Sequence, residues 1–293
     1  MVRMKQLDFL LVGFCKSGTS SFDVVLRQDK RIMLSEIKET QYISNHGNMD
    51  IDRFWNIYYP NYKKNKCIGG IEPTYCFHAK KIKETFGGNI KLIFMMRNPV
   101  KANYSQFKMR LRGQGNSEID KLYRKYSADN LPEMYEHYVN ALIKDKRNLR
   151  DDFQYDKWIK EYLKYFRLEQ MHFILFEDFI AEPQRVINET QEFLGLTPRR
   201  IGGVKKENSD SGISKNMICR LINKRISLWV NKWNNYPRIR NKLINLRNKI
   251  YQYTLVVNNK SMNRKTEEIL KDHYSHTIMY IEKILHRDLS NLW

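Results

Sequence analysis

The sequence predicts an α/β fold, with a central parallel sheet flanked by helices and a basic helical segment toward the C-terminus. Each of three short apolar runs ends in turn or polar residues, which is the pattern of a buried parallel strand. Helical patterns lie between and after the runs, and strands that alternate with helices favour a parallel sheet covered on both faces. The three predicted strands are Phe9–Phe14, Lys91–Met96 and His172–Phe176.

Four segments next to these strands have the residue pattern of helices. Asn98 and Pro99, which follow the second run, form a favourable N-cap and first-turn pair. The glycine pairs Gly69-Gly70 and Gly202-Gly203 are interpreted as turns. The predicted helices are Ser20–Arg27, Lys101–Leu111, Trp158–Phe166 and Pro183–Leu194.

The length and composition are those of a folded protein. The 293 residues are 42% apolar and 13% aromatic, which permits a sizeable core and excludes a disordered chain. We predict a single domain that spans residues 1–293. Because no acidic residue lies between Ser211 and Thr266, residues 211–266 are predicted to form a basic helical flap or insertion within it. Its first part, Ile218–Trp233, is amphipathic, and a last helix is predicted over Thr266–Leu285.

The chain is strongly basic, with 52 Lys and Arg against 32 Asp and Glu and a formal net charge of +20. Such a charge favours nucleic acid, an anionic lipid surface, an acidic polysaccharide or a charged nucleotide, and does not choose among them. The four cysteines lack C-x-x-C spacing, so neither a zinc site nor a disulfide framework is indicated, and a reducing compartment is expected. No apolar run approaches the roughly 20 residues of a membrane span, and we predict a cytoplasmic protein.

The first chemical signal lies in Gly13–Ser21, directly after the first predicted strand. A strand, a Gly-containing turn and a helix start together present backbone N–H groups and the positive end of a helix dipole to an anion. Lys16 stands two residues before Gly18, so this P-loop-type element is not a Walker A motif, in which Lys follows the second Gly. A plain strand-to-helix turn with an exposed lysine is the alternative. The predicted phosphate ligands are Lys16, Ser17, Gly18, Thr19, Ser20 and Ser21.

A second signal follows the second predicted strand, where Arg97 precedes Asn98 and Pro99. Ser105 lies further along the same segment, on the predicted helix. Ligands of open α/β sheets bind outside the carboxyl ends of the strands, and an arginine fork with a hydroxyl there suits a phosphate monoester. Taken alone, this pair is better explained by an arginine at a surface turn and a serine on a solvated helix.

Together the two signals resemble the family of sulfotransferases that use 3'-phosphoadenosine 5'-phosphosulfate (PAPS), and most of all its heparan-sulfate-type members and their bacterial relatives. The Lys16 loop is similar to the 5'-phosphosulfate loop of that family, and Arg97 with Ser105 to its 3'-phosphate site. The likeness spans nearly the whole chain. The other matching stretches are Ser35–Tyr42, Glu72–Tyr75, Phe176–Phe179 with Phe193–Leu196, and Arg287–Trp293.

Two departures from the family pattern concern basic residues. Where members often have Glu-Lys-x-Pro-Ser-Tyr, this chain has Ile71 at the lysine position, so a basic contact in the acceptor cleft is missing or supplied elsewhere. The loop that closes over the cofactor in heparan-sulfate-type enzymes has only a loose counterpart in Gly203–Lys206. The resemblance assigns Lys206 to the cofactor on this basis.

The resemblance implies an enzyme that moves a sulfuryl group from PAPS to a hydroxyl or amine of a carbohydrate, releases 3',5'-ADP and requires no metal. Glu39 is then the general base, and Lys16 stabilises charge on the leaving oxygen. His78 is a rival base, as in steroid- and phenol-type members. A solvated carboxylate paired with Lys38 is the structural alternative for Glu39.

Three further alternatives stay open at this point. The acceptor could be a small molecule or a lipid-linked saccharide instead of a glycan. A P-loop nucleotide or nucleoside kinase would also need a loop on a strand–helix turn, although it should show Lys after the second Gly and a metal-binding Asp. The segment 211–266 could gather an anionic glycan, rest on the inner membrane face, or simply pack on the core. No pattern of a specific nucleic-acid-binding protein is present.

Overall fold

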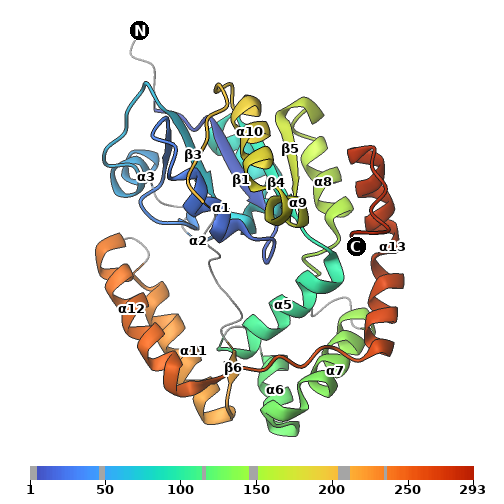
Figure 1. Ribbon diagram of the computed structural model, residues 1–293. Helices are drawn as coiled ribbons and strands as arrows, with labels where there is room; N and C mark the ends of the chain where they lie inside the picture. Colours follow the sequence, from blue (N-terminus) through green and yellow to red (C-terminus); the bar gives the residue numbers. More distant parts are fainter. Residues whose placement is uncertain (1–4, 46–49, 114–116, 145–150, 204–211, 234–235) are drawn as a thin grey trace. The chain divides into compact units, whose positions relative to one another are not determined.

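The computed structural model describes residues 5–45, 50–113, 117–144, 151–203, 212–233 and 236–293 (Figure 1). The chain divides into two compact units. The first consists of Met1–Asn98, Gln154–Glu207 and Thr277–Trp293, and the second of Pro99–Phe153 and Asn208–His276. The single domain expected for residues 1–293 stays a prediction.

The first unit is built on a five-stranded parallel sheet with the strand order β2-β3-β1-β4-β5. The expected α/β fold with a central parallel sheet is confirmed, and the three predicted strands are its β1, β4 and β5. The five strands are β1 (Phe9–Gly13), β2 (Ile32–Leu34), β3 (Cys67–Ile71), β4 (Lys91–Met96) and β5 (Met171–Leu175).

Helices cover both faces of this sheet because alternate residues of each strand point to opposite sides. Ile93 and Met95 of β4 belong to a buried core shared with Phe22 of α1 and Phe179 of α9. Phe94, between them, packs edge-on against Tyr162 of α8, with ring centroids 5.0 Å apart. The helices of this unit are α1 (Thr19–Leu26), α2 (Tyr42–Asn45), α3 (Ile51–Tyr58), η1 (Pro73–Phe77), α4 (Ala79–Phe86), α8 (Tyr155–Leu163), η3 (Leu168–Gln170), α9 (Phe176–Ala181) and α10 (Pro183–Phe193).

The interpretation of Gly69-Gly70 as a turn is wrong, since both glycines lie inside strand β3. A Cβ atom at Gly69 would come within 2.2 Å of the Phe9 ring on the neighbouring strand, and one at Gly70 within 3.0 Å of Leu10. The glycines are therefore needed for the close packing of large side chains on β1. Their lack of apolar side chains also hides this strand from a search for apolar runs.

The predicted element boundaries shift by a few residues. Strand β1 ends at Gly13, and β5 ends at Leu175 because Phe176 already begins α9. Helix α8 starts at Tyr155, three residues earlier than predicted, since Tyr155 is itself buried on the core side of the helix. Helix α5 begins at Pro99, directly after Asn98, as the N-cap and first-turn pattern predicts.

The second unit is mainly helical. Helix α11 corresponds to the predicted amphipathic stretch Ile218–Trp233, with slightly shifted ends. The last predicted helix is α13, which begins two residues earlier than predicted. Its residues up to His276 belong to the second unit and those from Thr277 to the first. Among the helices of the described residues, none has the length and apolar character to cross a membrane. The elements are α5 (Pro99–Leu111), α6 (Ser117–Lys125), η2 (Ala128–Asn130), α7 (Leu131–Lys144), β6 (Ile213–Ser214), α11 (Met217–Asn231), α12 (Pro237–Thr254), β7 (Leu255–Val256) and α13 (Arg264–Leu285).

The buried guanidinium of Arg220 ties α11 to α6. Its side chain is fully buried, and its Nε donates to Asp120 Oδ1 at 2.7 Å while Nη1 donates to the Arg110 carbonyl at 2.6 Å. Lys224, one turn later, reaches the other Asp120 oxygen at 2.7 Å. Burial tends to raise the pKa of Asp120, but the hydrogen bonds from Lys224 and Arg220 outweigh it and hold that pKa below its usual value.

We expect Arg220→Ala to lower the free energy of unfolding by about 3 kcal/mol, because the change leaves the Arg110 carbonyl without this donor and the Asp120 carboxylate with only Lys224 as its cation. Urea denaturation followed by circular dichroism measures the change. Arg225→Ala is the matched control, since Arg225 lies exposed on the same helix and should alter stability by less than about 0.5 kcal/mol. Equal losses in the two variants would contradict a structural role for the buried pair.

Candidate anion-binding site

The loop between β1 and α1 forms the core of the candidate site. Strand β1 is buried at every residue and delivers the chain to Cys15, Lys16 and Ser17 at its carboxyl end. Lys16 has a left-handed backbone conformation with φ 64°, and Gly18 follows with φ 84° as the N-cap of α1. Because the N-cap is a glycine, no N-cap side chain accepts a hydrogen bond from the first N–H groups of this helix.

Gly18 is required by both its conformation and its neighbour. A Cβ atom there would lie 2.5 Å from Cδ2 of Phe176, the first residue of α9. The left-handed conformation costs a residue with a Cβ atom roughly 1–2 kcal/mol. The loop therefore keeps its shape because a glycine allows the ring of Phe176 to pack directly against the backbone.

Arg97 lies beside this loop. Its guanidinium stands over the Phe176 ring, 4.7 Å from the centroid, and its Nη1 reaches the Lys16 carbonyl at 3.5 Å. Tyr155 of α8 donates its phenolic hydrogen bond to the Arg97 carbonyl at 2.8 Å and so fixes the end of β4. Two elements that the sequence predicted to bind one ligand, the Lys16 loop and Arg97, are thus neighbours in the first unit.

Three buried polar atoms of this region make no hydrogen bond of good geometry within the described chain: Ser17 Oγ, Arg97 Nε and Glu177 Oε2. The Ser17 hydroxyl also lies beside the Tyr155 phenol. Ser17 is completely buried, and the other oxygen of Glu177 accepts the Asn98 N–H at 3.0 Å. Buried polar groups without partners are uncommon in folded proteins, and at a concave loop they indicate a bound molecule or ordered water. Two of the three atoms are donors, so together with Lys16 and the helix start they suit an anion such as a phosphate or sulfate.

The hydroxyl-bearing residues of α1 differ in how deeply they are buried. Thr19 and Ser21 are buried, whereas Ser20 is half-buried. Ser105 is half-buried on the second turn of α5 and belongs to the second unit, so its pairing with Arg97 stays a prediction. Lys206 lies outside the described residues.

Glu39 has a left-handed backbone with φ 62°, and its N–H donates to the Ile71 carbonyl at 3.1 Å. Its carboxylate forms an ion pair with Lys38, and the two side chains are only 35% and 20% exposed, so the pair is not a freely solvated one. Burial alone would lower the pKa of Lys38, but the charges of Glu39, Asp23 and Cys15 hold it above its usual value. The pKa of Lys38 therefore depends both on Glu39 and on residues of the β1–α1 region.

Glu72 is a residue of this site that the sequence did not single out. It follows the last residue of β3, is only 2% exposed, and its N–H donates to the Leu11 carbonyl of β1 at 2.8 Å. Its carboxylate accepts the Thr40 N–H at 2.6 Å, the Thr40 hydroxyl at 2.5 Å and the Gln41 N–H at 3.2 Å. The available signal was its place in the Glu72–Tyr75 stretch that resembles the sulfotransferase family, since the glycines of β3 hide the strand before it.

The rival base His78 follows η1, where it is half-buried. Its Nε2 lies 3.4 Å from the Ser44 hydroxyl, and its ring stands edge-on to Tyr75. Neither Ser44 nor Tyr75 is one of the predicted phosphate ligands. The role of His78 as an alternative base stays untested.

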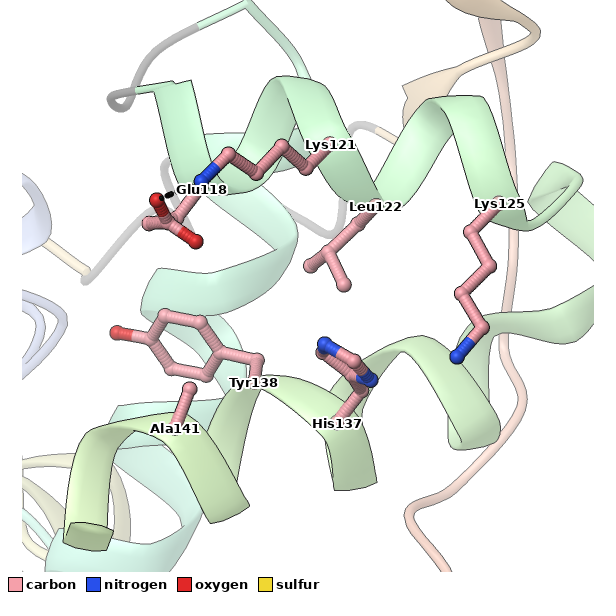
Figure 2. Close-up of a pocket in the computed structure, with 7 residues that line it drawn as sticks. All are labelled: Glu118, Lys121, Leu122, Lys125, His137, Tyr138 and Ala141. Atoms are coloured by element: carbon pink, nitrogen blue, oxygen red, sulfur yellow. Dashed lines mark hydrogen bonds and ion pairs between the residues drawn. The ribbon is translucent and has the colours of Figure 1, made fainter. Parts of the chain in front are cut away.

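A separate small cavity lies in the second unit, between α6 and α7 (Figure 2). Lys121 pairs with Glu118 there at 2.7 Å, so that lysine already has an acidic partner. None of the predicted site residues lines the cavity. Its lining residues are Glu118, Lys121, Leu122, Lys125, His137, Tyr138 and Ala141. Across the described residues, no group of three or more His, Cys, Asp or Glu side chains is arranged to hold a metal ion.

The fold and the β1–α1 loop define an α/β protein with a candidate site for a phosphate- or sulfate-bearing ligand at the carboxyl ends of its strands. The sulfotransferase domain model matches residues 6–211. Because this match covers most of the chain, the chain belongs to the sulfotransferase domain family, not to a nucleotide kinase family.

Individual relatives are distant. The membrane-associated sulfotransferase kil1 of Dictyostelium discoideum is 20% identical, and the alignment covers 69% of this chain and 58% of that protein, which is thus considerably longer than the matched part. The crystal structure of a sulfotransferase from Alicyclobacillus acidocaldarius has 18% identity and a TM-score of 0.65, over 98% of this chain and 99% of that one. It supports the fold. Mouse sulfotransferase SULT7A1, crystallised with PAP, shows 15% identity and a TM-score of 0.46, over 94% and 84% of the two chains.

We expect Gly18→Ala to weaken binding of 3',5'-ADP at least tenfold, because the added Cβ strains the backbone and displaces Phe176 from beneath Arg97. Isothermal calorimetry measures the affinity. Gly88→Ala is the matched control, since a Cβ atom there meets only the Lys83 side chain, at an ordinary contact distance of 3.7 Å. An unchanged affinity of the Gly18 variant would mean that the loop does not hold the nucleotide.

Proposed function

We propose that this chain transfers a sulfuryl group from PAPS to a hydroxyl or amine of a carbohydrate. The observation that carries the proposal is the anion-binding loop at Lys16, with the buried donors of Ser17 and Arg97 beside it. The family to which the chain belongs uses PAPS as donor, and the donor-rich loop fits its phosphate and sulfate groups. When bound, PAPS supplies the activated sulfuryl group.

The β1–α1 loop and Arg97 have separate tasks in this proposal. The N–H groups at the start of α1 and the hydroxyls of Ser17, Thr19, Ser20 and Ser21 hold the 5'-phosphosulfate end. Lys16 neutralises charge that develops on the oxygen released by sulfur. Arg97, with Ser105, binds the 3'-phosphate, and Lys206 is a further proposed cofactor ligand. The chain's own cations and N–H groups neutralise the phosphates, and we propose no metal requirement.

Glu39 is the proposed general base. As the acceptor oxygen or nitrogen forms its bond to sulfur, the proton leaves that atom for the Glu39 carboxylate, and the bond between sulfur and the 5'-phosphate oxygen breaks. The ion pair with Lys38 supports this role, since a neighbouring ammonium favours the charged carboxylate. A carbohydrate acceptor is proposed from the sequence resemblance, and a small-molecule or lipid-linked acceptor is the alternative.

Glu39 and Arg97 should separate turnover from nucleotide binding. We expect Glu39→Gln to lower the turnover rate by ~10²–10⁴ while the affinity for 3',5'-ADP stays normal, because only the proton acceptor is lost. Arg97→Ala should instead weaken 3',5'-ADP binding by roughly 1.5–3 kcal/mol, the range of a hydrogen bond to a charged group. Calorimetry measures the affinity for 3',5'-ADP. Transfer of ³⁵S from labelled PAPS to amino-sugar and neutral oligosaccharides measures the turnover rate.

ADP and ATP–Mg²⁺ are the matched ligands for this experiment, since both lack a 3'-phosphate. A preference for ATP–Mg²⁺ over 3',5'-ADP would contradict the proposed donor. A near-normal rate of Glu39→Gln would remove Glu39 as base and make His78→Gln the next variant to measure.

We also propose that the chain is cytoplasmic and that helices α11 and α12 rest on the anionic inner face of a membrane. The two helices pack on each other through a 3.1 Å contact between the Ser227 and Tyr251 hydroxyls and a 2.8 Å hydrogen bond from Thr254 to Asn223. Their outer sides keep large apolar side chains exposed. Those on α11 and α12 are Ile218, Leu221, Ile222, Leu228, Trp229, Ile239, Leu246 and Tyr253.

Cations share these surfaces. Lys242 and Lys249 stand exposed on α12 at the same seven-residue spacing as Ile239, Leu246 and Tyr253. Apolar side chains together with cations suit a membrane surface better than a polar polyanionic glycan, which would leave the apolar groups in water. The Dictyostelium relative is called membrane-associated, which is consistent with this proposal.

We expect Lys242→Gln/Lys249→Gln to weaken binding to vesicles containing phosphatidylglycerol by about 2 kcal/mol, since each cation near an anionic surface contributes about 1 kcal/mol. Vesicle co-sedimentation measures this, with phosphatidylcholine vesicles as reference. Lys63→Gln/Lys64→Gln, which removes two exposed charges of the first unit, is the charge-matched control. Binding to heparin without binding to anionic vesicles would assign these helices to a glycan instead.

A further inference from the structure

The backbone at residues 39–41 has an unusual conformation for its composition. Glu39 and Gln41, with φ values of 62° and 55°, are both in the left-handed region although neither is glycine. Each such residue costs on the order of 1–3 kcal/mol and persists only when its surroundings hold it there. The residue between them, Thr40, is buried.

The contacts that hold this turn come from the end of strand β3. The N–H of Glu39 donates to the Ile71 carbonyl at 3.1 Å. The next two N–H groups, of Thr40 and Gln41, both donate to the Glu72 carboxylate, which also accepts the Thr40 hydroxyl. Three consecutive N–H groups therefore end on two adjacent residues, and a run of N–H groups around one carboxylate is a stable anion-binding arrangement.

Glu72 is itself held firmly. Its N–H donates to the Leu11 carbonyl of β1, the strand that leads into the Lys16 loop. A buried carboxylate is a costly way to support a turn, since its burial is only offset by complete hydrogen bonding. Its position, between the strand that carries the loop and the segment that carries Glu39, gives the carboxylate a task beyond stability.

We propose that Glu72 is a positioning residue that holds Glu39 in the orientation from which it acts on the acceptor. The proposal rests on the proposed role of Glu39 as general base. Glu72 touches neither donor nor acceptor in this scheme, and it acts only through the backbone of residues 39–41. Loosening that backbone moves the Glu39 carboxylate, and a displacement of about 1 Å from the productive geometry can lower a rate by roughly 10².

The ionisation of Glu72 gives this role a pH signature. The pKa of Glu72 is raised to about 7, because burial and the negative charge of Glu39, which raise it, outweigh the hydrogen bonds from Thr40 and Gln41, which lower it. The other titratable groups facing it are the phenols of Tyr59 and Tyr75, whose pKa values its charge raises. An ionised carboxylate accepts all three donors well, so the turn is held best above pH 7.

Stability changes with pH in the opposite direction. The pKa of Glu72 in the folded protein lies above its ordinary value of 4.5. Between pH 4.5 and 7 the folded protein therefore keeps a proton that the unfolded chain has released. This contribution to stability is complete below pH 4.5 and is lost as the pH rises through 7. If Glu72 positions Glu39, the turnover rate should therefore rise over the same pH range in which stability falls.

The test uses Glu72→Gln, which keeps the side-chain length but replaces one acceptor oxygen with a donor. We expect kcat to fall roughly 10²-fold, with unchanged affinity for 3',5'-ADP by calorimetry. The wild-type rate step near pH 7 should disappear, and so should the fall in melting temperature between pH 5 and 8. Glu36→Gln is the matched control, because Glu36 is an exposed carboxylate on the same segment. A rate and a pH profile like those of wild type would overturn the proposal.

A second pair of variants keeps the test valid if Glu72→Gln fails to fold. Thr40→Val removes the hydroxyl donor at nearly constant shape, whereas Thr40→Ser retains it, so the serine variant should be the more active of the two by about tenfold or more, for a hydrogen bond to a charged group. Equal activity of the two variants would count against the positioning role of Glu72.

A double-mutant cycle separates this proposal from the proposed function. If Glu72 acts through Glu39, Glu72→Gln has little further effect on the rate in a Glu39→Gln background. If Glu39→Gln abolishes turnover and Glu72→Gln changes only the melting temperature, Glu39 remains the base and Glu72 is merely structural. If Glu39→Gln leaves the rate normal, the proposed base is wrong and the positioning role falls with it.

Discussion

The close contact between Gly18 and the Phe176 ring is the constraint on which the candidate site depends. It brings the backbone of the β1–α1 loop against the start of α9, with only a hydrogen where any other residue has a Cβ atom. The Phe176 ring also supports the Arg97 guanidinium, which lies 4.7 Å from the ring centroid. One aromatic side chain therefore fixes the distance between the loop and the cation, and neither can be repositioned without the other.

Sheet topology explains why these residues meet. Strands β3, β1, β4 and β5 are consecutive neighbours in a parallel sheet, so their carboxyl ends lie along one edge. The residues that follow those four ends are Glu72, the Lys16 loop, Arg97 and Phe176. Parallel pairing thus collects groups from four distant parts of the chain, as expected for ligand sites in open α/β sheets. The glycines of β3 leave room for the Phe9 and Leu10 side chains of β1, and the pairing of the two strands brings the Glu72 N–H to the Leu11 carbonyl.

The sequence was sufficient for the parts of this site that rest on local patterns. Strands β1, β4 and β5 are apolar runs, so the loop after β1 and Arg97 after β4 could be predicted together with the sheet. Strand β3 could not, because Gly69 and Gly70 are typical of turns and their reason for being glycine is Phe9, some 60 positions away. The burial of Glu72 was equally hidden, since its partners Thr40 and Gln41 are distant in sequence. Ser105 and the membrane contact depend on the second unit and stay predictions.

The remaining problem for such a site is electrostatic, because a general base must be negative close to a donor that carries phosphates and sulfate. Two carboxylates, Glu39 and Asp23, contribute charge near the loop, and each would repel an anionic ligand. The charges of both carboxylates raise the pKa of Lys38, and the raised pKa keeps Lys38 an ammonium ion at all physiological pH values. Half-buried between the segment of Glu39 and the β1–α1 region, it offsets their charge where screening by solvent is weakest. In the proposed mechanism, Lys38 thus lets one small region attract an anionic donor and still present the Glu39 carboxylate to the acceptor.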